Sequence, residues 1–182
     1  MTFKTFLSTA TAIALGTAVY ATNPTVGGAP MLVERNIIEN AVNSPVHTTL
    51  VAAVKAADLV ETLQGPGPFT VFAPVNDAFA ALPAGTVETL LMPENKAMLQ
   101  KVLTAHVVAG DWSAADIIAA ARASKDGFYH FNAVSGDALS AQVKGNNVYI
   151  LDESGNAARV TVADVDQSNG VIHVINAVLV PK

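Results

Sequence analysis

Four histidines are the side chains in this sequence best suited to acid–base chemistry or metal binding: His47, His106, His130 and His173. They are far apart along the chain, and none belongs to an H-E-x-x-H or H-x-H arrangement, which would bring two ring nitrogens to one metal ion. A zinc site assembled from them in space has no sequence signal. His106 and His173 each lie inside an apolar, strand-like segment without a local partner. We therefore expect both to be structural, with ring nitrogens bonded to nearby groups.

Other patterns that could support catalysis or ligand binding are incomplete. No G-x-S-x-G nucleophile elbow follows a strand, which argues against a serine hydrolase. Gly65-Pro66-Gly67-Pro68 lacks the Lys-Ser/Thr of a phosphate loop, so we interpret it as a turn. Residues 152–156 lack the alternating ligands and closing glutamate of a calcium loop and suit a hairpin tip. Asp164 and Asp166 share one face of a strand, which a solvated strand end explains as well as ion binding does. We predict a protein that is not an enzyme and uses no cofactor or metal.

Composition excludes several further classes. The 182 residues include 51% hydrophobic and 14% charged residues, which is typical of a folded domain. The net charge of −5 argues against nucleic-acid binding, which needs a basic face, and against docking on an anionic membrane. With no cysteine, the chain has neither disulfides nor a thiol nucleophile, and it cannot be a lipid-anchored lipoprotein.

The first residues are typical of a secretory signal. A single positive charge, Lys4, precedes the uncharged run Leu7–Val19, and Val19-Tyr20-Ala21 supplies small residues where a signal peptidase cleaves. Threonines and a serine make this run too polar for a membrane anchor. We predict a signal peptide over residues 1–21, a flexible Gly/Pro-rich lead-in over 22–35 and one domain over 36–181. The expected destination is the periplasm or the extracellular medium of a bacterium, without membrane insertion.

Hydrophobic periodicity predicts helices in the first half of the domain and strands in the second. Helices are expected from Met31, from Ser44 as N-cap with Pro45 at the first helical position, over 86–91 and 93–103, and from Ser113 to Ala121. Strands are expected over 69–73, 104–108, 129–134, 139–143, 148–151, 158–162 and 171–180. This segregation predicts an α+β fold.

Two longer motifs are more specific than any of these patterns. The segment 67–79, GPFTVFAPVNDAF, resembles the first signature of the fasciclin-like domain family, and 169–181, NGVIHVINAVLVP, resembles the second. The resemblance covers about Asn36 to Pro181. It implies a compact α+β wedge of about seven strands with helices packed around it.

The signature residues have a physical interpretation as parts of that fold. Thr70–Ala73 and Val171–Ile175 are continuous apolar runs, as strands covered on both faces require, so we expect them to lie close together in the core. Pro74 and Asn76 suit a strand-to-helix corner, and Asn169-Gly170 suits a tight turn. The residues that we expect to be structural in this way are Thr70, Phe72, Pro74, Asn76, His106, Asn169, Gly170 and His173.

The resemblance implies a secreted, non-enzymatic domain for adhesion or for interaction with surface or matrix components. The expected partner is a cell-surface or matrix protein or polysaccharide, and the expected state is a monomer. In animal members an Asp-Ile pair before the second signature is an integrin-recognition motif, and the matching residues here, Asp164 and Val165, are the candidate adhesion contact. Many relatives carry Tyr-His in the central strand, where this chain has Ala105-His106.

An alternative function is a small-ligand or lipid-binding module that uses a groove between the helices and the wedge. An apolar pocket of roughly several hundred cubic ångströms would favour this alternative over adhesion.

Overall fold

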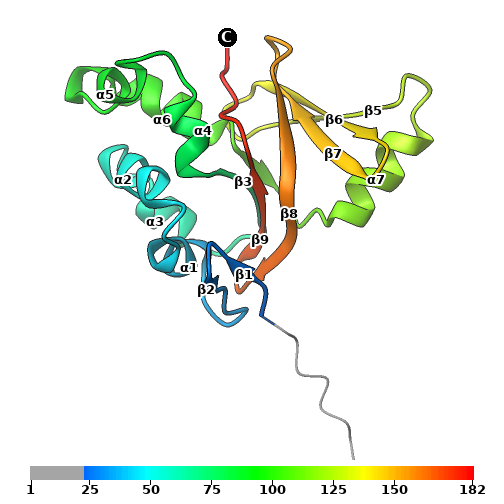
Figure 1. Ribbon diagram of the computed structural model, residues 1–182, viewed down its shortest axis with the longest axis horizontal. Coiled ribbons are helices and arrows are strands. Elements are labelled where there is room, and N and C mark those ends of the chain that lie inside the picture. The colour runs from blue at the N-terminus through cyan, green and yellow to red at the C-terminus, as the bar shows by residue number, and fades with distance from the viewer. Residues whose placement is uncertain (1–22) are drawn as a thin grey trace, which may run out of the picture.

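The computed structural model describes residues 23–182, and Figure 1 shows its elements. The strands are β1 (Thr25–Val26), β2 (Ala29–Pro30), β3 (Phe69–Pro74), β4 (Val107–Ala109), β5 (Phe128–Asn132), β6 (Ala138–Lys144), β7 (Asn147–Leu151), β8 (Ala157–Gln167) and β9 (Gly170–Ile175). The helices are α1 (Ile37–Asn43), α2 (Thr48–Ala56), α3 (Val60–Leu63), α4 (Asn76–Ala80), α5 (Thr86–Leu90), the 3-10 turn η1 (Pro93–Asn95), α6 (Lys96–Thr104) and α7 (Ala114–Ala123).

Seven of these strands form one sheet in the order β4-β3-β9-β8-β7-β6-β5. All neighbours in it are antiparallel except β3 and β9, which run parallel, with Phe72 opposite His173. The two signature strands are therefore direct neighbours, which confirms that they lie together. The two ends of the sheet approach each other, because the backbone N–H of Val134, just after β5, donates to the carbonyl of Val107 in β4 at 2.7 Å. The predicted α+β wedge of seven strands is confirmed.

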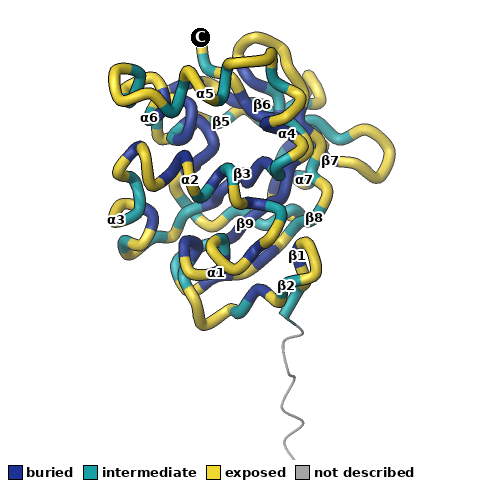
Figure 2. Tube along the Cα trace, turned by 60° about the vertical axis from the view of Figure 1, so that its left-hand side comes forward, coloured by how far each residue is buried: buried dark blue, intermediate teal, exposed yellow. Residues whose placement is uncertain are grey.

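The helices divide between the two faces of the sheet. Figure 1 shows α1 to α6 on the side of β3 and β9, and α7 beside β5 and β6. Figure 2 shows β3 and β9 as a buried track between exposed outer segments. Because side chains alternate along a strand, β3 contributes Val71 and Ala73 to the core under α1–α6 and Phe72 to a second core under α7. The continuous apolar sequence of β3 follows from this double coverage.

Two helices begin with reciprocal caps. Asn36 accepts the N–H of Glu39, whose carboxylate accepts the N–H of Asn36 in return, at the start of α1. Ser113 and Asp116 make the same exchange at the start of α7, as the sequence predicts. The expected cap at Ser44 is wrong. Ser44 ends α1, and its hydroxyl lies 2.8 Å from Nδ1 of His47, the residue that precedes α2.

The predicted flexible lead-in needs a correction, whereas the predicted signal peptide, residues 1–21, lies outside the described residues. Within residues 22–35, β1 and β2 form a hairpin, and Val26 and Met31 are buried at 4% and 2% exposure. Gly27 and Gly28 both have positive φ, as a two-residue hairpin turn requires. The glycine pair therefore makes a tight turn, and the apolar residues that flank it pack on the core.

Candidate functional site

Asp164 lies where β8 is irregular. The pairing with β9 shifts register between Val162 and Val165, and Asp164 has a φ of 54°, which non-glycine residues seldom adopt. Its side chain is exposed, and Oδ1 accepts the backbone N–H of Ala114, the first residue of α7, at 2.7 Å. The carboxylate therefore caps α7 from another element, where the helix dipole favours negative charge.

Val165, the other half of the predicted adhesion pair, is completely buried at 0% exposure. It lies opposite Ile172 of β9 and belongs to the core under α1–α6. Because Val165 is buried in the core while the exposed Asp164 carboxylate bonds to α7, the two side chains do not form one contact. The prediction of a joint Asp164–Val165 contact is corrected accordingly: the valine fills the core, and the aspartate caps a helix.

His173 connects three elements through its ring. Nε2 donates to the carbonyl of Trp112 at 2.8 Å, while Nδ1 accepts the backbone N–H of Asp164 at 3.2 Å. The ring also stacks on Phe72, with centroids 5.7 Å apart. Burial lowers the pKa of His173 below its ordinary value, in accord with a neutral ring that accepts at one nitrogen and donates at the other.

His106 holds the C-terminal segment in the same manner. Nδ1 donates to the carbonyl of Val102 at 2.8 Å, and Nε2 accepts the N–H of Leu179 at 2.9 Å. Burial lowers the pKa of His106 to about 4. Ala105, at the position where many relatives have tyrosine, is 1% exposed and follows α6 inside the fold.

The strand-to-helix corner is made by Pro74 and Asn76. Pro74 ends β3, and Asn76 begins α4. Oδ1 of Asn76 accepts the backbone N–H of Thr49 at 3.0 Å, and Nδ2 donates to the carbonyl of Pro45 at 3.1 Å. Asn76 therefore satisfies a free N–H in the first turn of α2, which has no cap from its own preceding residue.

The side chains of Thr70 and Phe72 lie on the face of β3 that points away from the core under α1–α6. The hydroxyl of Thr70 donates to the carbonyl of Gly110 at 2.8 Å and accepts the N–H of Trp112 at 2.9 Å. Phe72 is 1% exposed and lies 6.0 Å from the ring of Phe131. Thr70 therefore fixes the segment between β4 and α7, and Phe72 packs in the second core.

Asn169 and Gly170 join β9 to the helical side. Nδ2 of Asn169 donates to the carbonyls of Leu63 and Gly65 at 2.8 and 3.0 Å. At Gly170 any Cβ would overlap the carbonyl oxygen of Phe69, so only glycine permits this approach of the two strands. The eight signature residues thus bond or pack within the domain, and the structure does not assemble them into one reactive site.

One polar cluster on the surface was not predicted from the sequence. His130 of β5 lies opposite Ser140 of β6, with Nδ1 2.8 Å from the serine hydroxyl and Nε2 2.8 Å from Oδ2 of Asp126. Hydrogen bonds from the Ser124 hydroxyl and from His130 lower the pKa of Asp126. The i, i+4 spacing of Asp126 and His130 was the available signal. The His130 side chain is 62% exposed, so water competes for these bonds and the three groups form a solvated surface network.

A small apolar cavity lies between the helices and the sheet. Its volume is about 60 Å³, and it lies between α1, α2, α3 and α6 on one side and β3 and β4 on the other. Ligand sites for drug-sized molecules have roughly 300–1,000 Å³. This cavity is therefore too small to favour the small-ligand alternative. A more open, largely apolar depression of about 440 Å³ is lined by α5, α6 and the C-terminal segment, and it includes no residue of the seven-stranded sheet, so it is not the predicted groove between helices and wedge.

Two absences hold within residues 23–182. No group of three or more His, Cys, Asp or Glu side chains is arranged to hold a metal ion. In the same described range, no helix is both long enough and apolar enough to cross a membrane.

Comparisons with known proteins agree with the fold. Residues 45–181 match the family model of the fasciclin domain. The chain is 54% identical over 145 residues to protein sll1483 of Synechocystis sp., across 80% of this chain and 73% of that protein. It is 31% identical over 180 residues to the cell surface glycolipoprotein MPB83 of Mycobacterium bovis, across 93% and 72% of the two chains. A solved FAS1 domain pair from the insect cell adhesion molecule fasciclin I superposes with a TM-score of 0.70 at 18% identity, and the match covers 84% of this chain and 52% of that chain.

Proposed function

The chain belongs to the fasciclin domain family, and on that premise we propose that it is an exported, non-enzymatic domain that binds a cell-surface or matrix component. The observation that carries the proposal is the match of nearly the whole described chain to a domain of a cell adhesion molecule. A relative that aligns with 93% of the chain is a cell surface glycolipoprotein, which supports a place at or beyond the cell surface.

The signature residues form hydrogen bonds and packing contacts within the domain, which supports a non-enzymatic function. Both ring nitrogens of His106 and His173 are occupied by partners in the fold, which leaves neither ring free to transfer a proton to a substrate. Binding then depends on exposed side chains, which vary independently of the fold.

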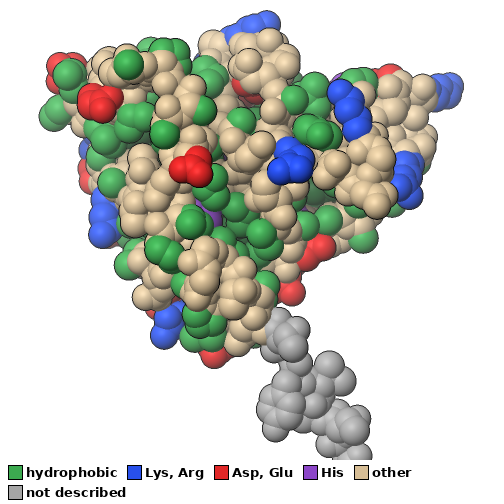
Figure 3. All heavy atoms as spheres, in the orientation of Figure 1, with side chains coloured by type: hydrophobic (Ala, Val, Ile, Leu, Met, Phe, Trp, Pro, Cys, Tyr) green, Lys and Arg blue, Asp and Glu red, His purple; other side chains and the backbone are tan. Residues whose placement is uncertain are grey.

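The charge distribution supports a protein or polysaccharide partner in preference to a nucleic acid. The net charge is −5, and Figure 3 shows cationic and anionic side chains scattered over the displayed face with hydrophobic side chains between them. Counterion release from nucleic acid requires clustered cations, which this face lacks. We propose that the domain acts as a monomer, which light scattering of the purified protein tests.

Export is tested at the N-terminus. We expect N-terminal sequencing of the mature protein to begin near Thr22. The protein should be recovered from the periplasmic or extracellular fraction. Retention of residues 1–21 on a membrane-bound product would contradict export by a cleaved signal.

Binding is tested with the labelled, purified protein on intact cells and on extracellular matrix. We expect saturable binding that excess unlabelled protein displaces. Pretreatment of the surface with protease or with periodate then separates a protein partner from a polysaccharide. Binding that neither saturates nor is displaced would contradict the proposed function.

A further inference from the structure

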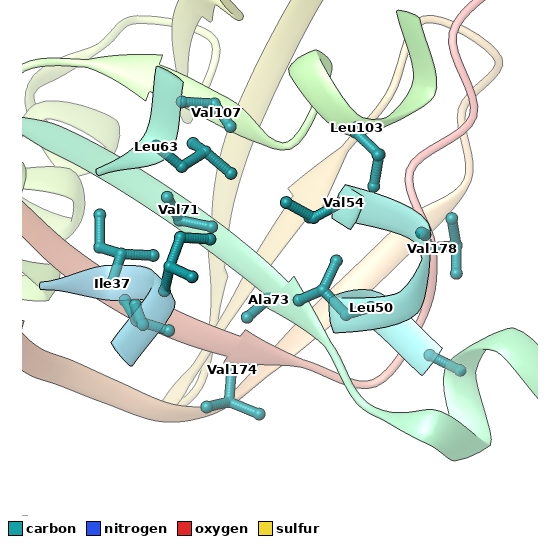
Figure 4. Packing of buried hydrophobic residues seen from close by; sticks show 14 of the residues in the cluster. Ile37, Leu50, Val54, Leu63, Val71, Ala73, Leu103, Val107, Val174 and Val178 are labelled. Atoms are coloured by element: carbon teal, nitrogen blue, oxygen red, sulfur yellow. The ribbon is translucent and has the colours of Figure 1, made fainter. Parts of the chain in front are cut away.

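The cavity between the helices and the sheet has a strongly apolar wall. Figure 4 shows side chains of α1, α2, α3 and α6 directed toward β3 and β4. Buried residues that form this wall include Ile37, Leu50, Val54, Leu63, Val71, Leu103 and Val107. An aliphatic wall favours an apolar occupant, because water in such a space would lack hydrogen-bond partners.

The cavity reaches the surface at a rim of exposed residues. Lys55 of α2, Thr62 of α3 and Val134, which follows β5, border it, and Val134 is 52% exposed. Among residues 23–182, no carboxylate lies within ion-pair distance of the Lys55 ammonium. The rim therefore combines an apolar entrance with a cation that a partner's carboxylate can meet.

The volume restricts the occupant. A dry apolar cavity of about 150 Å³ accommodates benzene. At about 60 Å³, this cavity is too small for an aromatic ring and suits a branched aliphatic group of the size of a valine or leucine side chain.

We propose that this cavity is the anchor site for one branched aliphatic side chain of a partner protein, next to an acidic residue of the partner that meets Lys55. The inference rests on the proposed function and specifies its contact surface. Energetically dominant contacts in protein interfaces lie in well-packed, desolvated pockets. This anchor lies on the helical side of β3 and β4 and is separate from Asp164, which caps α7 on the other side.

The direct test uses 4-methylpentanoate as a probe, because it combines a branched aliphatic end with a carboxylate. Methyl NMR of the folded protein should show saturable shifts at Leu63, Val71 and Leu103, with a Kd on the order of millimolar. Acetate, which lacks the branched group, should cause no saturable shift at these methyls. Absence of saturation with 4-methylpentanoate would overturn the proposal.

Two variants separate the apolar contact from the ionic one. The V71I/V107I double variant adds two methylene groups to the wall, and Ile suits a strand as well as Val does, so we expect binding to weaken about tenfold or more. Val160→Ile on β8, which does not border the cavity, is the matched control and should bind like the wild type. Lys55→Gln should weaken binding of 4-methylpentanoate about two- to fivefold, as expected for the loss of an exposed ion pair. Binding of the neutral 4-methylpentanamide should be unchanged. Equal binding by V71I/V107I and the wild type would overturn the proposal.

The same variants distinguish failure of the anchor from failure of the proposed function. If the wild type binds cells or matrix and V71I/V107I binds equally well, the proposed function stands and the anchor assignment is wrong. If the wild type binds neither surface, the proposed function is wrong. If V71I/V107I loses binding and Val160→Ile does not, the result supports both the proposed function and the anchor assignment.

Discussion

The side-chain oxygen of Asn169 accepts the backbone N–H of Ile37, the first residue of α1, at 3.0 Å. The two residues are 132 positions apart in the chain. Because the amide of the same side chain donates to the carbonyls of Leu63 and Gly65, one asparagine joins α1, the end of α3 and the start of β9. The second family signature therefore holds the helical layer on the sheet.

Replacing Asn169 by Ala should destabilise the domain by about 2–3 kcal/mol, because it removes a helix cap and leaves two carbonyls without their donor. The shift of the urea unfolding midpoint relative to the wild type measures this loss of stability. Asn132→Ala, at an exposed position of β5, is the matched control and should cost less than about 0.5 kcal/mol. Equal midpoints for the two variants would contradict the structural role of Asn169.

Gly170→Ala should be more severe, because the added Cβ overlaps the carbonyl of Phe69 on the neighbouring strand. We expect a loss of more than about 3 kcal/mol, or no folded protein. Gly136 also has a positive φ, but nothing lies within 4 Å of a Cβ built there. Gly136→Ala should therefore cost only the local strain of about 1–2 kcal/mol. Circular dichroism during thermal unfolding ranks the two, and the opposite ranking would contradict the close approach at Gly170.

The elements that local periodicity describes were predictable from the sequence. The adjacency of β3 and β9 followed from two continuous apolar runs, and the cap of α7 followed from Ser113 and Asp116. The orientation of Val165 was not predictable from the local sequence. It depends on the register shifts of β8 beside Asp164, and these shifts are set by the pairing of β8 with β9.

The hydrogen-bond partners of the signature side chains could not be predicted from the local sequence, because these partners are distant along the chain. His106 accepts a hydrogen bond from Leu179, and His173 donates to Trp112, so the sequence could indicate internal histidines without indicating what they bind. The cavity beside Lys55 is likewise formed by segments from α1 to β4 together with Val134, so it has no local sequence pattern.

The low pKa of His106 predicts a loss of stability in acid. The folded-state pKa is about 4 and the ordinary value is 6.5, so the unfolded chain binds more protons between these pH values. The stabilisation is complete above about pH 6.5 and is lost as the pH falls toward 4. Between pH 7 and pH 4.5 the wild type should lose about 2–3 kcal/mol more than His106→Gln, which has no such titration. Urea unfolding at both pH values measures the difference, and parallel losses would contradict a buried neutral ring.

Filling the cavity should stabilise the domain. A void of about 60 Å³ corresponds to roughly 1.4 kcal/mol at about 24 cal/mol per Å³, so V71I/V107I should gain up to about 1 kcal/mol of stability. The urea midpoint should therefore rise, and that of Val160→Ile should not. A fall of more than about 1 kcal/mol would indicate overpacking and contradict the open volume.

The most direct test of the function is the binding isotherm of the labelled mature protein on the cells and matrix of its own source. A surface-binding fasciclin domain should give a saturable isotherm that unlabelled protein displaces and that heat-unfolded protein does not reproduce. An isotherm that stays linear, resists displacement or is the same for the unfolded protein would contradict the account.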